Sequence, residues 1–260
     1  MRDPKLKVKT TKTRQRVRKG ILLISFLLFP VTFYSKFYDV SPVLIFQTSS
    51  MGIINFFVIR CIYLFISALF LGRAYCGWVC EAAGCQEALF SVNNEKIRGG
   101  DIVKWIIWVP WIIAIILVVI SAGGYKGIEV FYLTKKFRSS MSNAGHLAMY
   151  LTVFIIVLGL IILPSLTIGR RSFCHHICWF APFMIIGRKL RNLFKWPSLQ
   201  LISDPGACKH CHACTEHCPM SLPVENMINR SNMENLECIL CGTCVDTCKF
   251  GVIKYDWGRK

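Results

Sequence analysis

Cysteine residues in the last quarter of the chain have a spacing suited to metal ligation. Eight of the 14 cysteines lie between residues 208 and 248. They form two runs of the pattern Cys-x2-Cys-x2-Cys-x3-Cys, displaced by 30 residues at each position: Cys208, Cys211, Cys214 and Cys218, then Cys238, Cys241, Cys244 and Cys248. Zinc sites prefer two separated pairs of cysteines. A triplet followed by a more distant fourth cysteine therefore favours iron–sulfur clusters.

This spacing is that of bacterial two-cluster ferredoxins, in which the fourth cysteine of each run ligates the other cluster. We therefore expect two 4Fe-4S clusters, one on Cys208, Cys211, Cys214 and Cys248 and one on Cys238, Cys241, Cys244 and Cys218. Lys249 replaces the proline that follows the first run, a change that removes no ligand. Residues 208–212 also match the spacing of c-type haem attachment. We reject haem, because the same cysteines complete the ferredoxin pattern.

A second group of cysteines belongs to an internal repeat. Residues 73–80 recur 98 residues later as residues 171–178, and each copy reads Arg, any residue, an aromatic residue, Cys, three residues and Cys. Cysteines four apart project from one face of a helix, so the two copies are able to present four thiolates to one shared centre. The four are Cys76, Cys80, Cys174 and Cys178.

Several interpretations of this second group remain open. Four thiolates suit an iron–sulfur cluster or zinc, and a redox centre is favoured in a chain that already carries ferredoxin motifs. The cysteines are alternatively small buried residues where helices approach closely, or a redox-active thiol pair. Cys85, His175 and His176 are further candidate ligands of the same centre.

Long apolar segments must position these cysteines. The chain has 260 residues, of which 54% are hydrophobic and 17% charged, and its mean hydropathy is +0.48. Four apolar segments fall at about residues 20–36, 52–72, 102–122 and 147–168. Because about 20 apolar residues cross a bilayer, we predict four transmembrane helices in a mainly α membrane protein. One Cys repeat follows the second helix and the other follows the fourth, which predicts two repeated hairpins related by an axis along the membrane normal.

The basic residues indicate how the helices are oriented. The net charge is +17, but residues 1–195 hold 25 Lys and Arg against 7 Asp and Glu, whereas residues 196–260 hold 6 against 7. Residues 1–19, the loop before the third helix and the segment after the fourth carry nine, four and six Lys and Arg, against one and four in the opposite loops. Basic segments resist translocation, so both termini are expected in the cytoplasm. This distribution leaves no surface for nucleic acid, and a reducing cytoplasm disfavours disulfides.

The predicted domain organisation follows from these assignments. Residues 1–19 form a basic cytoplasmic tail, and residues 20–179 form the four-helix membrane domain. Residues 180–200 mix apolar and basic residues and are expected to be an amphipathic linker along the inner membrane surface. Residues 201–260 form a small α+β two-cluster ferredoxin domain in the cytoplasm.

Taken together, these motifs resemble the membrane iron–sulfur proteins of the NapH and NosR type, and more distantly the CcoG-like proteins. Those proteins usually have proline after each Cys-x3-Cys pair, whereas this chain has Glu81 and Trp179, and Cys85 is an addition. The resemblance implies 4Fe-4S electron transfer between the quinone pool and a partner oxidoreductase, in the cytoplasmic (inner) membrane of a prokaryote. One alternative is a maturation or metal-handling factor that reduces a metal ion or a disulfide, and another is a redox-sensing subunit.

Two ionisable residues are candidates for a role in quinol chemistry. Arg60 falls midway along the second apolar segment, where a charge costs at least ~2.5 kcal/mol and is often functional. A snorkelling residue is the alternative. His146, at the outer end of the fourth helix near Tyr150, is placed to receive a quinol proton or is merely interfacial. No Gly-x-Gly-x-x-Gly motif for a nucleotide is present, so any substrate is the quinone itself or is bound by another protein.

Overall fold

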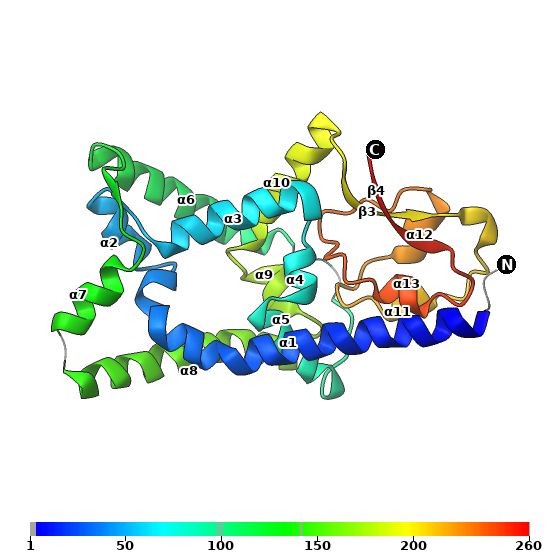
Figure 1. Ribbon diagram of the computed structural model, residues 1–260, viewed down its shortest axis with the longest axis horizontal. Helices are drawn as coiled ribbons and strands as arrows, with labels where there is room; N and C mark the ends of the chain where they lie inside the picture. Colours follow the sequence, from blue (N-terminus) through cyan, green and yellow to red (C-terminus); the bar gives the residue numbers. More distant parts are fainter. Residues whose placement is uncertain (1–3, 98, 100, 141, 260) are drawn as a thin grey trace.

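The computed structural model describes residues 4–97, 99, 101–140 and 142–259. Of the basic residues counted above, Arg2, Arg98 and Lys260 lie outside the described residues, as do the first three positions of the predicted tail. The molecule is elongated, with apolar helices at one end and the cysteine-rich domain at the other (Figure 1). Both termini lie near the cysteine-rich end (Figure 1).

The part of the chain that precedes the C-terminal domain is mainly helical. Its elements are α1 (Pro4–Val40), α2 (Ile45–Ser50), β1 (Ile53–Ile54), α3 (Phe56–Leu71), α4 (Ala74–Trp78), α5 (Glu81–Ala88), the 3-10 helix η1 (Leu89–Ser91), α6 (Val103–Ser121), β2 (Gly127–Ile128), α7 (Tyr132–Ser140), α8 (Asn143–Thr167), α9 (Ser172–His176) and α10 (Ala181–Phe194). Strands β1 and β2 pair in parallel over two residues. This short pairing ties the loop before α3 to the loop after α6.

The C-terminal domain has the mixed α and β content expected of it. Its elements are β3 (Ser198–Ser203), the 3-10 helix η2 (Pro205–Ala207), α11 (Ala213–Glu216), α12 (Val224–Asn229), α13 (Thr243–Thr247) and β4 (Ile253–Gly258). The first and last strands pair antiparallel, from Ser198 opposite Gly258 to Ser203 opposite Ile253. The two short helices α11 and α13 each begin one residue before the third cysteine of a run.

Two helices among the described residues are long and apolar enough to cross a bilayer. They are α6, and α8 over Ala144–Thr167, and in each only 11% of the most apolar 18-residue window is buried. Ile106 of α6 and Ile155 of α8 are 65% and 66% exposed. Apolar faces of this extent usually mark a surface that meets lipid or a partner. The other two predicted spans differ: α3 is apolar but has 16 residues, because Asn55 caps its start, and α1 continues the basic tail.

The predicted tail and first apolar segment form one continuous helix rather than two separate parts. Helix α1 has 37 residues and begins at Pro4, not near residue 20. Its N-terminal part lies along the cysteine-rich domain (Figure 1), where Arg14 Nε donates to Asp246 Oδ2 at 3.0 Å and Gln15 Nε2 donates to the Cys241 carbonyl at 3.1 Å. The boundary predicted near residue 20 was therefore wrong, because the tail continues into the apolar segment as one helix, and Arg14 and Gln15 of that tail bind the C-terminal domain.

The four long helices do not pack as two hairpins. Helix α1 lies beside α8, and the hydroxyl of Tyr150 donates to the Pro30 carbonyl at 2.9 Å. Helices α3 and α10 pack together, with α6 on the same side of the molecule, while α4, α5 and α9 lie between these two layers (Figure 1). Helix α1 thus packs mainly on α5 and also contacts both α3 and α8, while the Cys-bearing helices occupy the middle.

The predicted linker packs against protein on both faces. Gly187 of α10 lies against α3 so closely that a Cβ would come 2.8 Å from the Phe65 carbonyl oxygen. On the other face, Arg188 forms an ion pair with Glu234 at 2.6 Å and Arg191 donates to the Gly258 carbonyl at 2.9 Å. Two basic residues of this segment therefore bind the C-terminal domain, and its position along the membrane surface stays a prediction.

The close approach of α5 to α1 yields a testable prediction. A Cβ on Gly84 would overlap the Leu22 carbonyl oxygen and lie 3.2 Å from the Phe26 Cβ. We expect Gly84→Ala to force the helices apart and to lower the free energy of unfolding by about 1–3 kcal/mol. Thermal melting of the helical circular-dichroism signal in detergent measures this effect.

Gly159→Ala is the matched control, since nothing lies within 4 Å of the position of its Cβ. Alanine is favoured over glycine inside a helix, so this variant should melt at or slightly above the temperature of the unmodified protein. Equal melting temperatures for the two variants would show that α1 does not pack on α5 in this way.

Candidate functional site

Two cavities in the C-terminal domain divide the eight ferredoxin cysteines between them. The first cavity is lined by Cys208, Cys211, Cys214 and Cys248. The second cavity is lined by Cys218, Cys238, Cys241 and Cys244. The structure thus brings together each set that the sequence predicts, including the exchange of the fourth cysteine between runs.

The backbone around the two cavities repeats the same unusual conformation. His210 and His212, on either side of Cys211, have left-handed φ angles of 51° and 56°, and Leu240 and Gly242, at the equivalent positions of the second run, have φ angles of 48° and 75°. A non-glycine residue in this region costs about 1–2 kcal/mol. Because this cost recurs at equivalent positions of both runs, we infer that each loop is shaped to enclose a bound group.

The chemistry of the buried thiols also suits a cluster. Burial raises the pKa of Cys218 to about 11, although backbone N–H groups of Leu222 and Met220 donate to its sulfur. Burial likewise raises the pKa of Cys238 to about 12, against a hydrogen bond from the Leu240 backbone. A bound metal deprotonates such thiols, and hydrogen bonds to sulfur tune an iron–sulfur cluster. Four soft sulfur ligands at each cavity therefore fit a 4Fe-4S cluster.

The two copies of the internal repeat bring their cysteines together. Among Cys76, Cys80, Cys174 and Cys178, each thiol lies close enough to the other three to interact with them electrostatically. We call these four residues the central cysteine set. Cys178 accepts hydrogen bonds from the backbone N–H groups of Phe180 and Ala181 at the start of α10.

The pairs do not share one helix face as the spacing predicts. Helix α4 ends at Trp78, and Cys80 has an extended conformation with φ −64° and ψ 124°. Likewise, α9 ends at His176 before Cys178. The expectation of helical pairs was wrong, because in each copy of the repeat the one-turn helix ends between the two cysteines. The thiols still converge because the two copies face each other.

Spacing argues against zinc in the central cysteine set. Tetrahedral zinc, with Zn–S bonds of about 2.3 Å, requires thiolates about 3.8 Å apart. Over the described residues, Asp101, His175 and Glu237 form the one group of three or more potential ligands whose atoms lie within 4.8 Å of one another. Neither the central cysteine set nor the two ferredoxin sets contain three thiols as close together as this. A larger metal–sulfur cluster therefore fits all three sets better than a single ion.

The arginine that opens each repeat is buried beside the central cysteine set. Arg73 is 1% exposed and pairs with Glu237 at 2.5 Å. Arg171 is fully buried, donates to the Cys76 carbonyl at 2.8 Å and also pairs with Glu87. Both guanidinium groups interact electrostatically with the Cys174 thiol. The repeat pattern contains these arginines, and their recurrence was the available signal for a role.

Uncharged side chains complete the surroundings of the central cysteine set. Gln86 is buried and its Nε2 donates to the Cys174 sulfur at 3.3 Å. The Cys76 thiol lies 3.5 Å from the sulfur of Met184 in α10. Sequence reasoning missed both residues, because neither belongs to the repeat.

The central cysteine set is in contact with the second cavity. A Cβ on Gly77 would overlap the Ile239 carbonyl oxygen and lie 3.4 Å from the Cys241 Cα. The indole N–H of Trp78 donates to the Leu240 carbonyl at 3.1 Å. Helix α4 therefore lies directly on the loop that carries two ligands of the second predicted cluster.

The additional candidate ligands have other partners. Cys85 packs with Ile161 and Phe173, and burial alone raises the pKa of its thiol. His175 Nδ1 lies 2.7 Å from Asp101 Oδ1, and His176 Nδ1 lies 2.8 Å from the Ser172 carbonyl. These contacts direct the three residues to the core and to polar partners, so their role as ligands remains a prediction without geometric support.

Arg60 lies beside the central cysteine set. Its Nη2 donates to the hydroxyl of Tyr75 at 2.7 Å and to Glu81 Oε2 at 3.2 Å, and Tyr75 and Glu81 are the neighbours of Cys76 and Cys80 in the chain. The guanidinium also lies 4.9 Å from the ring centroid of Phe180. Arg60 thus has protein partners on the Cys-bearing side of α3.

His146 lies in a different part of the molecule. It is 5% exposed in the first turn of α8, and its ring centroid is 5.3 Å from that of Tyr34. Helix α8 has 25 residues, which corresponds to about 37 Å, and Cys174 follows its far end. The structure therefore does not bring His146 and Arg60 to one site.

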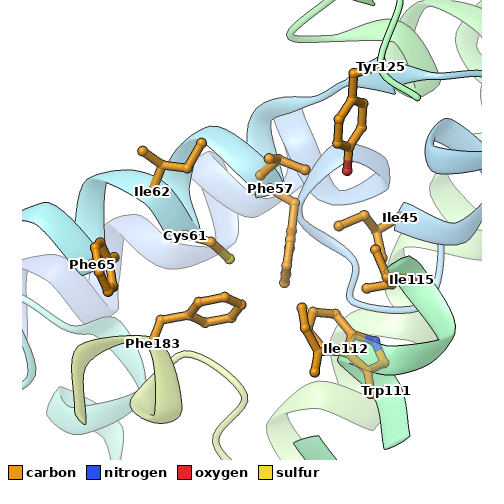
Figure 2. Close-up of a pocket in the computed structure, with 11 residues that line it drawn as sticks. Ile45, Phe57, Cys61, Ile62, Phe65, Trp111, Ile112, Ile115, Tyr125 and Phe183 are labelled. Atoms are coloured by element: carbon orange, nitrogen blue, oxygen red, sulfur yellow. The ribbon is translucent and has the colours of Figure 1, made fainter. Parts of the chain in front are cut away.

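An apolar cavity of about 210 Å³ separates α3 from α6. Figure 2 shows Phe57, Trp111, Ile115 and Phe183 directed into it, from α3, α6 and α10. Its lining is almost entirely hydrocarbon, as is common for pockets that bind small apolar molecules. Phe57 also packs on Phe180, at 5.3 Å between ring centroids, and so connects this cavity to the residue that Arg60 covers.

Known proteins share these segments. A 4Fe-4S dicluster domain matches residues 200–249, and a 4Fe-4S binding domain matches residues 54–91 and 150–197, which contain the two repeats. The chain is 23% identical to an uncharacterized Methanocaldococcus jannaschii protein, MJ0749, over 76% of this chain and 70% of that protein. It is 23% identical to the putative electron transport protein YccM of Escherichia coli over 70% of this chain and 50% of YccM. It is 25% identical to the ferredoxin-type protein NapH of Haemophilus influenzae over 71% of this chain and 62% of NapH. No solved structure matches the chain.

The division of cysteines between the two cavities predicts the iron content of double variants. Cys218→Ala with Cys244→Ala removes two residues from the second cavity, and we expect a loss of about four irons per chain. Cys214→Ala with Cys218→Ala removes one residue from each cavity, and we expect a loss of about eight. Iron and protein assays on anaerobically purified material measure both. Equal losses from the two variants would contradict the exchange of the fourth ligand.

Proposed function

We propose that this chain, an iron–sulfur electron-transfer protein related to the NapH-type family, connects a membrane quinone pool to a partner protein. The observation that carries the proposal is a chain of contacts from the apolar cavity, past the central cysteine set, to the two ferredoxin cavities. At one end of this path the residues suit an apolar quinol, and at the other end they suit iron–sulfur clusters.

The inner end of the path is a continuous core. Cys76 and Cys174 belong to the same cluster of buried residues as Cys214, Cys218 and Cys241 of the ferredoxin domain. Close packing of this kind excludes water from between the cysteine sets. A 4Fe-4S cluster held by each set would supply one-electron acceptors, which take up the two electrons of a quinol in turn.

The outer end of the path has features that suit a quinol headgroup. Oxidation of a quinol releases two electrons and two protons. Arg60 holds the Glu81 carboxylate at 3.2 Å, between the aromatic wall of the apolar cavity and Cys80. We infer that Glu81 accepts one proton there, while the second leaves to water, and that the apolar cavity holds the ring. The reverse steps reduce a quinone.

A membrane position supports this assignment. The apolar outer faces of α6 and α8 suit lipid, and we propose that α1 and α3 cross the bilayer with them as a four-helix unit. Both termini lie at one end of the molecule (Figure 1), which agrees with an even number of crossings. The excess of Lys and Arg in the segments at that end favours a cytoplasmic location for the ferredoxin domain.

Electron transfer accounts for more of the molecule than a metal-handling role does. A maturation factor that reduces a metal ion would use additional ligands near the central cysteine set. Cys85 instead belongs to an apolar cluster with Ile161 and Phe173, against which Cys178 also packs, and His176 is bonded to the backbone of its own helix. The apolar cavity likewise suits a lipophilic substrate better than an ion.

Removal of the central cysteine set tests the path. We expect Cys76→Ala with Cys174→Ala to leave the ferredoxin clusters reducible by dithionite, while reduction by a short-chain quinol slows at least about 100-fold. Cys85→Ala is the control, because Cys85 is equally buried but lies outside the set. Anaerobic stopped-flow absorbance measures both reactions. Quinol reduction at the unmodified rate in the double variant would exclude the central cysteine set from the path.

Filling the apolar cavity tests the quinone site separately. Ile115 is 5% exposed and points into the cavity (Figure 2). We expect Ile115→Trp to slow reduction by quinol about 10-fold or more through loss of binding space, with dithionite reduction unchanged. Ile155→Trp, on the outward face of α8, is the matched control. If both variants react with quinol at the same rate, the quinone binds elsewhere.

A further inference from the structure

We propose that the exposed edge of the first cavity is the docking surface for an acidic, soluble electron-carrier protein. This inference rests on the proposed function and adds to it the chemistry of the partner. The docking edge comprises Lys209, Cys211, His212, Lys249 and Phe250, of which four line the first cavity.

Exposure distinguishes the first cavity from the second. Cys211 is the one exposed cysteine among the eight of the two ferredoxin runs, all of which the structure describes. The second cavity is covered by α4, through the contacts of Gly77 and Trp78, and by α1, whose Gln15 donates to the Cys241 carbonyl. A soluble protein therefore reaches the cysteine sets most closely at Cys211.

The docking edge is positively charged, although its domain is not. Residues 196–260 hold 6 Lys and Arg against 7 Asp and Glu. Lys209 and Lys249 each stand one residue after a cysteine of the first cavity, Cys208 and Cys248, and both are exposed. Two lysines from different halves of the domain thus lie on the rim of one cavity.

The nearby carboxylates already have cationic or hydrogen-bonding partners. Glu225 is 11% exposed and contacts Nδ1 of both His210 and His212, at 3.0 Å from the former. Glu216 pairs with Lys96 at 2.5 Å. These contacts leave the charges of the two lysines available to a partner, because neither carboxylate is committed to them.

An apolar group at the docking edge completes the surface. The Phe250 side chain is 51% exposed, yet it also lines the first cavity. Transient redox complexes bury small interfaces, in which charge steers the encounter and a few apolar contacts fix the geometry. An acidic protein with its redox group near its own surface matches this combination.

The position of the docking edge favours a soluble partner over a lipid surface. Helix α11, which contains the third cysteine of the first run, lies in the half of the molecule opposite the free ends of α6 and α8 (Figure 1). If α6 and α8 lie in lipid, the docking edge is displaced from the bilayer along the long axis of the molecule. Anionic headgroups are therefore the less suitable occupant.

Charge reversal tests the docking surface. The probe is an acidic plant-type [2Fe–2S] ferredoxin, mixed with the full-length protein in detergent or lipid. We expect Lys209→Glu with Lys249→Glu to weaken binding of the oxidised probe at least about 10-fold at low ionic strength. The difference should diminish at high salt, because screening removes the contribution of the lysines. Titration calorimetry gives the dissociation constant, and stopped-flow mixing with dithionite-reduced protein gives the rate of electron transfer.

Arg230→Glu is the matched control, since Arg230 is an exposed cation of the same domain that lines neither cysteine cavity. It should bind the probe as the unmodified protein does. Unchanged binding in the double variant, an equal loss in Arg230→Glu, or tighter binding of the basic protein cytochrome c than of the ferredoxin would overturn the proposal. The proposal would also be overturned if the full-length protein bound anionic vesicles and not the probe, and if the double variant lost that vesicle binding.

The failure of this proposal is distinguishable from failure of the proposed function. Reduction of the double variant by quinol does not involve the docking edge and should be unchanged. Probe binding that depends on the lysines, in a protein that quinol does not reduce, would retain the docking surface and exclude the quinone connection.

Discussion

The contact between α4 and the Ile239–Cys241 loop is the constraint on which the arrangement depends. Gly77 allows it, because any side chain at that position would overlap the Ile239 carbonyl oxygen. The contact brings the residue next to Cys76 against the residues between Cys238 and Cys241. Without it, the repeat in the apolar half and the ferredoxin domain would be two separate groups of thiols. With it, the three cysteine sets form one continuous interior.

Buried charges stabilise this junction. Arg73 and Lys104 both pair with Glu237, at 2.5 and 2.6 Å, and tie the start of α4, α6 and the ferredoxin domain together. Burial alone would raise the pKa of Glu237, but the two cations outweigh burial and hold it below its usual range. Arg18 and Arg171 share Glu87 in the same way on the other side of α4. Loss of one partner from such a group leaves an uncompensated charge, which typically costs about 3–5 kcal/mol. The buried ion pairs therefore fix how the ferredoxin domain is oriented on α4, in addition to holding the two in contact.

Sequence reasoning was most successful where local spacing determines geometry. The spacing within each run was enough to predict that its first three cysteines meet, because three such closely spaced cysteines must share one loop. The exchange of the fourth cysteine was predicted from the known pattern of bacterial two-cluster ferredoxins. The internal repeat likewise predicted that Cys76, Cys80, Cys174 and Cys178 come together. Periodicity was misleading within each pair, since α4 and α9 end at Trp78 and His176, two residues before the second cysteine. A spacing of four does not by itself distinguish a helix from a helical turn followed by extended chain.

Long-range partners explain most of what the sequence could not predict. Polar residues at positions 13–19 read as a free tail until Asp246 and Glu87, both distant in the chain, provide partners for Arg14 and Arg18. The pairing of Arg188 in α10 with Glu234, 46 residues later in the chain, could not be predicted either. Similarly, the hairpin arrangement was inferred from chain order, whereas the apolar helices pair according to which faces fit, with α1 beside α8. None of these contacts leaves a periodic signal in the sequence.

The most direct test of the account is the reaction of the oxidised, lipid-reconstituted protein with a short-chain quinol under anaerobic conditions. The account predicts rapid loss of the iron–sulfur absorbance, to the same final extent as dithionite produces when the quinol is in sufficient excess and of sufficiently low potential. An absorbance that dithionite bleaches completely and such a quinol leaves unchanged would contradict it.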